Sequence, residues 1–179
     1  SDKTGTLTLN RMTVEEVYTD GHLFRAEELP TAGLDTTGAI LSGGKPLGLL
    51  LTALALSNDS RADASGALIG DPTETALLEL ARGRGYLGEG LAEKYPRLAE
   101  IPFDSDRKLM TTFHPWENGR IISFTKGAVE EIVACSEKAH STRGAELFDR
   151  TKILQIADRI AGDGLRALGF GMRVWDKIP

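Results

Sequence analysis

The pattern of apolar and polar positions in the first half of the chain predicts a β-hairpin followed by helices. Residues 12–19 are rich in β-branched and aromatic side chains, and Asp20-Gly21 is a common two-residue turn from which the chain returns over 22–26. The apolar run 46–56 opens with a proline, which suits the first turn of a helix. The other elements expected here are a helix over 71–82, a short helix around 91–94 and loops over 30–45 and 58–70.

The second half reads as a series of strands with helical insertions. The expected strands are 98–103, 108–114, 120–126 and 165–175, and the expected helices are 128–136 and 146–161. Strands that are joined directly by tight turns must run antiparallel. We therefore predict an α+β fold, an antiparallel β-sheet flanked by helices, rather than a doubly wound parallel sheet.

Composition limits the function classes. The 179 residues, 41% of them apolar, suit one domain. With 21 Lys and Arg against 26 Asp and Glu, the net charge of −5 argues against nucleic acid as a partner. A single cysteine, Cys135, and three scattered histidines give no zinc-ligand spacing. No apolar run approaches the ~20 residues that span a bilayer, and the start at Ser1 without a methionine leads us to expect a piece of a longer polypeptide.

The first residues carry the most specific pattern, Asp2-Lys3-Thr4-Gly5-Thr6-Leu7-Thr8. A carboxylate can attack a phosphoryl group to form an acyl phosphate, and small hydroxyl and glycine residues suit a turn close to phosphate. This stretch resembles the phosphorylation motif D-K-T-G-T-[LIV]-T of the P-type ATPases. The resemblance implies that Asp2 is the phosphoryl acceptor, that Lys3 adds positive charge, and that Asp2 and the Thr4 carbonyl bind Mg²⁺.

Haloacid-dehalogenase-like phosphatases share this phosphorylation domain, but they usually carry a second aspartate two positions after the nucleophile. Here that position is Thr4. Losing the carboxylate removes a general acid and base, so the acyl phosphate is expected to live longer, as a pump requires. A phosphatase with a cap domain remains an alternative.

Two later segments resemble parts of the P-type nucleotide site. Residues 70–77 resemble G-[DE]-x-T-E-x-A-L, which implies that Glu74 hydrogen-bonds the adenine amino group. Glu74 also stands three residues after Asp71, where a capping-box acid belongs, so both roles are open. Residues 103–110 resemble F-x-x-x-[RK]-K-x-M. The implied roles are stacking on adenine for Phe103 and phosphate contacts for Lys108 and Arg107.

The residues that follow Phe103 also predict its position in the fold. Five polar or charged residues follow it, so we expect it at a strand end near solvent rather than in the core. This position favours the role in a pocket.

Two further segments follow in the family's order. Residues 125–128 resemble the K-G-A segment, which implies that Lys126 lies deep in the ATP cleft and that Gly127 allows a tight backbone turn. In isolation Lys126 would be an ordinary surface lysine. Residues 163–168 resemble G-x-R-x-L, which implies that Arg166 contacts the phosphate tail and Leu168 the adenine or ribose side. Arg166 and Leu168 are expected on the last strand.

Two glycine-rich patterns are rejected. The G-x-G-x-x-G at 83–88 follows a helix instead of a strand, so the dinucleotide-binding context is missing. Gly43-Gly44-Lys45 is followed by Pro46 where a Walker motif has Ser or Thr.

The resemblance covers nearly the whole chain. It implies that residues 1–10 are the edge of a phosphorylation domain and residues 11–179 a nucleotide-binding domain on the cytoplasmic side of a multi-pass membrane pump. Its partners would be ATP, Mg²⁺ and the phosphorylation, actuator and transmembrane domains of the same polypeptide. We expect the chain alone to be a monomer that binds ATP without hydrolysing it. Calcium is the first candidate for the transported ion, and an interaction domain that has lost nucleotide binding is a second alternative.

Overall fold

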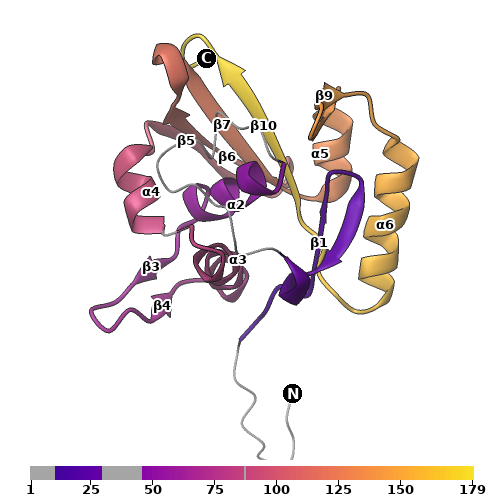
Figure 1. Cartoon of the computed structure of the whole chain (residues 1–179), viewed down its shortest axis with the longest axis horizontal. Coiled ribbons are helices and arrows are strands. Elements are labelled where there is room, and N and C mark those ends of the chain that lie inside the picture. Colours follow the sequence, from indigo (N-terminus) through magenta and orange to yellow (C-terminus); the bar gives the residue numbers. More distant parts are fainter. Residues whose placement is uncertain (1–10, 30–45, 87) are drawn as a thin grey trace, which may run out of the picture.

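The described structure is built on a central antiparallel sheet. The computed structural model describes residues 11–29, 46–86 and 88–179. The strand order in the sheet is β10-β7-β6-β5, formed by β5 (Ala99–Asp104), β6 (Leu109–Pro115), β7 (Ile121–Gly127) and β10 (Gly169–Trp175) (Figure 1). Helices flank this sheet, which confirms the expected α+β fold.

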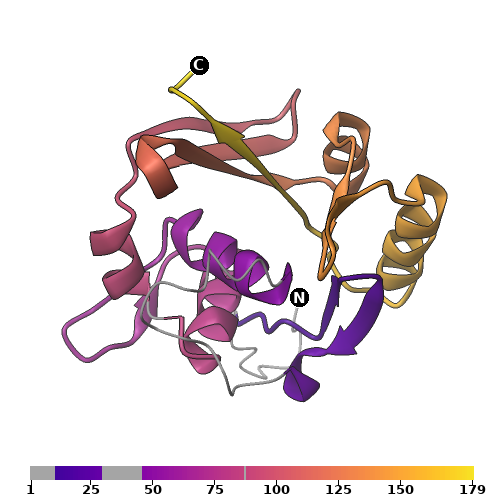
Figure 2. The ribbon, with the colours of Figure 1, turned by 45° about the horizontal axis from the view of Figure 1, so that its top comes forward.

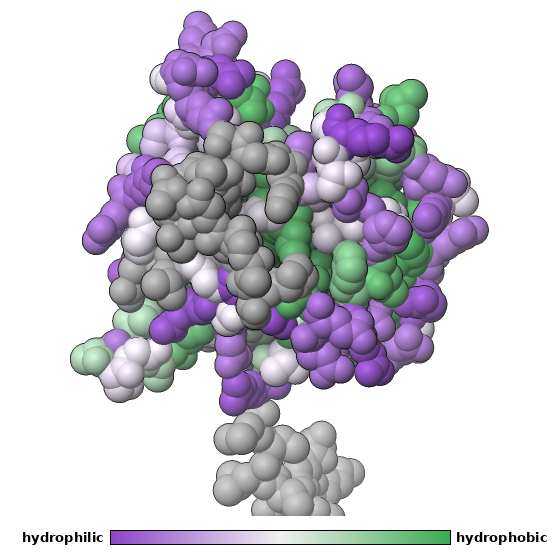
Figure 3. Space-filling model, in the orientation of Figure 1, coloured by the Kyte–Doolittle hydropathy of each residue, from purple (hydrophilic) through white to green (hydrophobic). Residues whose placement is uncertain are grey.

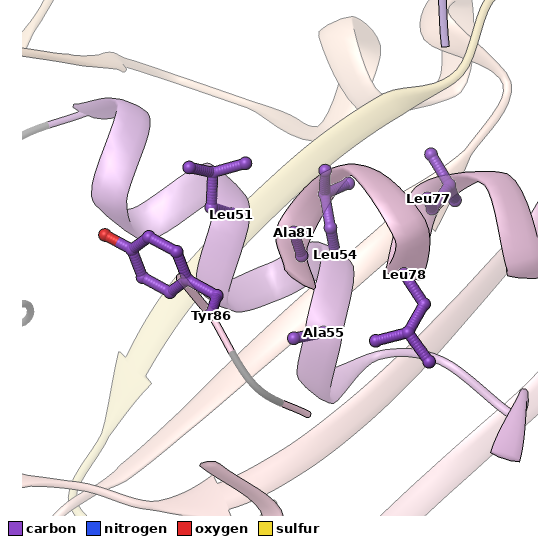
Figure 4. Close-up of a cluster of buried hydrophobic side chains, with 7 residues drawn as sticks. All are labelled: Leu51, Leu54, Ala55, Leu77, Leu78, Ala81 and Tyr86. Atoms are coloured by element: carbon purple, nitrogen blue, oxygen red, sulfur yellow. The ribbon is translucent and has the colours of Figure 1, made fainter. Parts of the chain in front are cut away.

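Helix α2 (Pro46–Leu56) is packed on two sides. Its sequence is apolar all round, which is typical of a helix without a solvent-facing side. Leu51 lies in a buried cluster with residues of α3 (Pro72–Gly83) (Figure 4). Leu56 packs instead with Phe124 of β7, in the cluster that joins α2 to the sheet. The helix therefore holds α3 against the sheet.

The first hairpin follows its turn chemistry. Strands β1 (Glu16–Thr19) and β2 (His22–Arg25) pair with only Asp20 and Gly21 between them. Both turn residues have positive φ, 51° and 75°, as a type I′ turn requires. The turn was predicted correctly, although the strand before it is shorter than the expected 12–19.

Two further hairpins were not predicted. Strands β3 (Arg61–Ala62) and β4 (Leu68–Ile69) pair within the expected loop 58–70, and β8 (Ala139–Ser141) pairs with β9 (Gly144–Glu146). Strands of two or three residues are too short to show a periodicity of two. The remaining elements are η1 (Ala26–Glu28), α4 (Gly88–Lys94), η2 (Glu117–Gly119), α5 (Val129–Cys135) and α6 (Arg150–Gly162).

The bounds of α6 correct the expected helix over 146–161. Its N-cap is Asp149, whose carboxylate accepts a hydrogen bond from the Lys152 amide at 3.0 Å. This cap fixes the first helical residue at Arg150, and of the residues before it Glu146 belongs to strand β9 instead.

Strand β10 starts later than the predicted 165–175. The Leu165 amide donates to a carbonyl in the last turn of α6 at 3.2 Å, and Gly164 has a φ of 79°. This is the Schellman pattern of a helix end, which occupies the backbone that a strand would need. Arg166 and Leu168 therefore precede β10 and do not lie on it, because the strand begins at Gly169.

The peripheral elements divide around α2. Helix α4 and the β3–β4 hairpin lie on one side of it, and the β1–β2 hairpin, α5 and α6 on the other (Figures 1 and 2). Among the described helices, none is long and apolar enough to cross a membrane.

His114 is a buried titratable group of the sheet. It is 1% exposed and its ring packs near Phe124. A carbonyl can only accept, so Nδ1 donates to the Tyr95 carbonyl at 2.9 Å, and Nε2 accepts from the Thr112 hydroxyl at 2.9 Å. Both ring nitrogens are thus satisfied by the neutral form. Burial lowers the pKa of His114 below its usual value of 6.5.

We expect His114 to lower the free energy of unfolding in acid. Between its lowered native pKa and the unfolded value near 6.5, the unfolded chain binds more protons, so stability falls as pH falls through this window. The free energy of unfolding in urea should drop from pH 7.5 to 5.5 by up to about 1.4 kcal/mol per unit from this residue. His114→Gln should lose that part of the slope, whereas the exposed His22→Gln should keep it. Equal slopes in both variants would contradict the assignment.

Candidate nucleotide-binding site

A buried ion pair links the sheet to α3. The side chain of Lys126, near the end of β7, is 8% exposed, and its Nζ lies 2.5 Å from Glu74 Oε1. Nζ also donates to the Ser57 carbonyl, and Glu74 Oε2 accepts from the Asp59 amide at 3.1 Å. The structure thus brings together two of the residues predicted from sequence. Lys126 is not a surface lysine.

The first turn of α3 shows which of its acids acts as the cap. Asp71 is the N-cap, and its carboxylate accepts from the Thr73 amide at 2.9 Å, while Pro72 opens the helix. Both Glu74 oxygens are engaged by Lys126 and the loop after α2. The helix cap therefore does not need Glu74, and its carboxylate faces the sheet.

A β-bulge precedes the turn between β5 and β6. Ile101 pairs with Thr111 and Asp104 with Leu109, so two residues of β5 oppose the single β6 residue Met110. An extra residue shifts the alternation of faces along a strand by one position, so Ile101 and Asp104 lie on the same face although they are three residues apart.

Phe103 is the second of the two bulge residues and is 62% exposed. Met110, which it opposes, pairs in turn with Lys126 of β7. Phe103, Met110 and Lys126 are therefore neighbours across three adjacent strands. Phe103 lies on the edge strand β5. Its position at a strand end near solvent was predicted correctly.

Gly127 allows a close approach between β7 and the start of β6. A Cβ at this position would lie 2.0 Å from the Lys108 carbonyl oxygen, which accepts from the Ala128 amide at 3.2 Å. Lys108 itself has a φ of 57°. Its ammonium lies 3.9 Å from the Glu130 carboxylate and about half of its side chain is exposed, so it is free to meet an anion.

The turn from 104 to 108 is shaped by Asp104. Its carboxylate accepts from the amides of Arg107 and Asp106, which lowers the pKa of Asp104 below its usual value. Arg107 Nη2 donates to the Leu109 carbonyl at 2.9 Å, and its buried Nε has no partner among the described residues. The turn thus fixes the backbone between Phe103 and Lys108.

Arg166 and Leu168 reach the site from the segment between α6 and β10. Arg166 Nη1 donates to the Thr73 hydroxyl at 3.2 Å, one residue before Glu74. Leu168 packs, half-buried, against the α2–α3 cluster. Arg166 therefore lies at the rim beside the start of α3, whereas Leu168 serves the core that supports it.

Sequence reasoning missed the backbone contributions of Ser57 and Asp59. Both act through main-chain atoms, so their side-chain types carry no signal. Asp2, Lys3 and Thr4 lie outside the described residues. Within the ranges that are described, no group of three His, Cys, Asp or Glu side chains could hold a metal ion.

A wide hollow of about 1710 Å³ lies beside this site rather than in it. It extends between α2, β10, the β1–β2 hairpin, α5 and α6, where apolar surface gathers (Figure 3). Thr73, Arg166 and Leu168 line its margin, but Glu74 and Lys126 do not. The polar cluster and this hollow are therefore separate features that meet at Thr73.

The ion pair yields a test of stability. Glu74→Ala should lower the free energy of unfolding by about 3 kcal/mol, because it leaves the Lys126 ammonium buried without its counter-charge. The double variant Glu74→Leu with Lys126→Met should recover most of this loss, since no charge is then buried. Urea unfolding measures both. If the double variant loses as much free energy of unfolding as the Glu74→Leu and Lys126→Met single variants together, the two groups do not interact.

Comparison with known proteins places the chain in a family. Residues 47–178 match the family model described as P-type ATPase, cytoplasmic domain N. The cation-transporting ATPase pma1 of Synechocystis sp. is 38% identical over 97% of the chain. The calcium-transporting ATPase 1 of Lactococcus lactis is 44% identical over 74% of it, and the calcium-transporting ATPase of Bacillus subtilis 33% identical over 97%.

The chain spans only part of each relative. It covers 20% of the Synechocystis protein, 14% of the Lactococcus protein and 21% of the Bacillus protein. The family match extends over most of this chain, and the identities are above 30%. The chain therefore belongs to the P-type ATPases and contains their cytoplasmic domain N.

Proposed function

We propose that residues 11–179 form the ATP-binding domain of an ATP-driven cation pump. The observation that carries this proposal is the exposed Phe103 ring, which opposes Met110 and so lies in the same cross-strand row as Lys126, the partner of Glu74 in the ion pair. A flat apolar surface beside fixed polar groups is the combination that a nucleobase needs. The family assignment argues against the phosphatase alternative.

Each group has a defined role in this proposal. The Phe103 ring stacks on the base, and aromatic stacking contributes ~1–3 kcal/mol. The Glu74 carboxylate only accepts hydrogen bonds, so it selects the amino group of adenine over the carbonyl of guanine. Lys126 fixes the orientation of that carboxylate. Lys108 and Arg166, both with exposed cationic ends, and Arg107 face the phosphates.

The same proposal extends to the rest of the pump. Residues 1–10 belong to the phosphorylation domain, where the Asp2 carboxylate attacks the γ-phosphorus and ADP leaves. Lys3 and Thr4 support that step, and Mg²⁺ supplies charge neutralisation when bound near Asp2 and Thr4. The actuator and membrane-spanning parts complete the polypeptide, with this domain on the cytoplasmic side. Calcium is the proposed transported ion, because two of the relatives above are named calcium-transporting ATPases.

The base-stacking role is tested by titrating ATP into the 179-residue chain. Phe103→Ala should bind about 5- to 150-fold more weakly, as loss of one stacked ring predicts. Ile101→Ala is a matched control, because Ile101 is an exposed apolar residue of the same strand before the bulge. GTP should bind more weakly than ATP. Absence of ATP binding at millimolar concentration would favour the interaction-domain alternative.

A second test concerns catalysis by the chain alone. We propose that it binds ATP without transferring phosphate, since phosphoryl transfer needs positioned Mg²⁺ as well as the nucleotide and the chain spans about a fifth of the Synechocystis and Bacillus relatives. Incubation with γ-labelled ATP should leave the protein unlabelled. An acid-stable label that disappears in Asp2→Asn would contradict this expectation.

A further inference from the structure

Arg97 forms hydrogen bonds and ion pairs with the segment that follows α2. Its Nη1 lies 2.8 Å from the Asp59 carboxylate and 2.7 Å from that of Glu100. Its Nη2 donates to the Asn58 carbonyl at 3.1 Å and to the Leu56 carbonyl at 3.4 Å. One guanidinium therefore holds the last carbonyl of the helix, the next loop and a strand of the sheet.

The same segment carries the backbone atoms that hold the ion pair. The Ser57 carbonyl accepts from Lys126, and the Asp59 amide donates to Glu74. Arg97 bonds the residues on both sides of Ser57. Residues 57–59 are thus fixed between Arg97 on one side and the buried pair on the other.

The other end of this connection is the strand that carries Phe103. The Leu98 amide donates to the Phe113 carbonyl at 2.8 Å, which fixes the backbone next to Arg97 against β6. Glu100 belongs to β5, three residues before Phe103. Arg97 therefore ties β5 to the loop that orients Glu74.

We propose that Arg97 is a positioning residue, which sets the place of the Glu74 carboxylate relative to the Phe103 ring. This inference rests on the proposed function, because it concerns the adenine side of the same site. Arg97 itself makes no contact with the nucleotide in this proposal. Arginine suits the task because its planar fork donates in several fixed directions, whereas a lysine ammonium is a point charge on a flexible stem.

The contacts to backbone carbonyls separate this role from that of a surface ion pair. The Arg97 side chain is 27% exposed, whereas that of its partner Asp59 is 62% exposed. An exposed carboxylate alone would contribute little. Arg97 also donates to the carbonyls of Leu56 and Asn58, contacts that an ion pair between two exposed side chains does not make.

The variant that tests this is Arg97→Lys in the 179-residue chain. Adenosine and ATP should both bind about tenfold more weakly, the loss expected when an oriented hydrogen-bonding group is displaced. Tripolyphosphate should bind as before, because Lys108 and Arg166 are not attached to residues 57–59. The Asp59 amide, bonded to Glu74 in the wild type, should exchange its hydrogen faster.

Two further variants complete the design. Arg143→Lys is the matched control, because Arg143 forms an i,i+3 ion pair with Glu146 as Arg97 does with Glu100. It should leave all three affinities unchanged. Glu100→Gln removes one anchor of Arg97 and should weaken adenosine about threefold, which keeps the test valid even where Arg97→Lys unfolds.

The outcomes are distinct. Unchanged adenosine binding in a folded Arg97→Lys chain overturns the inference, as does an equal loss for adenosine and tripolyphosphate, which indicates general destabilisation. Absence of ATP binding in the wild type overturns the proposed function itself, and with it the inference. Selective loss of adenosine with faster exchange at Asp59 supports the positioning role.

Discussion

The burial of the Lys126 ammonium is the constraint on which the candidate site depends. A charge removed from water is costly unless it is paired and hydrogen-bonded. Here the partners come from two other parts of the chain, the Glu74 carboxylate and the Ser57 carbonyl. Their positions follow from the end of α2 and the first turn of α3. The two helices and the sheet are consequently held in one relative arrangement by an interaction that also faces the proposed nucleotide.

The apolar core supports that arrangement from behind. Helix α2 packs against α3 on one side and against β7 on the other, so its length and its end point determine where residues 57–59 lie. Arg97 then connects these residues to β5. Hydrogen bonds and packing contacts therefore connect the core to Glu100, and the backbone of β5 continues from there to Phe103. Rigid support of this kind limits the entropy that is lost when a ligand binds.

The side chains of the site differ in their exposure to solvent, and their proposed roles follow from this difference. Lys126 is buried, Glu74 is partly buried, and the two side chains bind each other, so they act through fixed geometry. Phe103 is largely exposed, and Lys108 and Arg166 have only weak or single partners. A flat ring and loosely paired cations can meet a ligand without breaking the fold. The Thr73 hydroxyl, which holds Arg166, marks where the site meets the wide hollow beside α6.

The sequence alone determined the elements whose signals are local. The Asp20-Gly21 turn, the Asp71 cap and the apolar α2 each depend on neighbouring residues, and the structure agrees with all three. The family motifs also named the residues of the candidate site, whose roles stay predictions. Tertiary structure decided the β3–β4 and β8–β9 pairings, the late start of β10, the bulge that places Phe103, and the partners of Glu74. These depend on backbone atoms and on residues far apart in the chain, which no local pattern encodes.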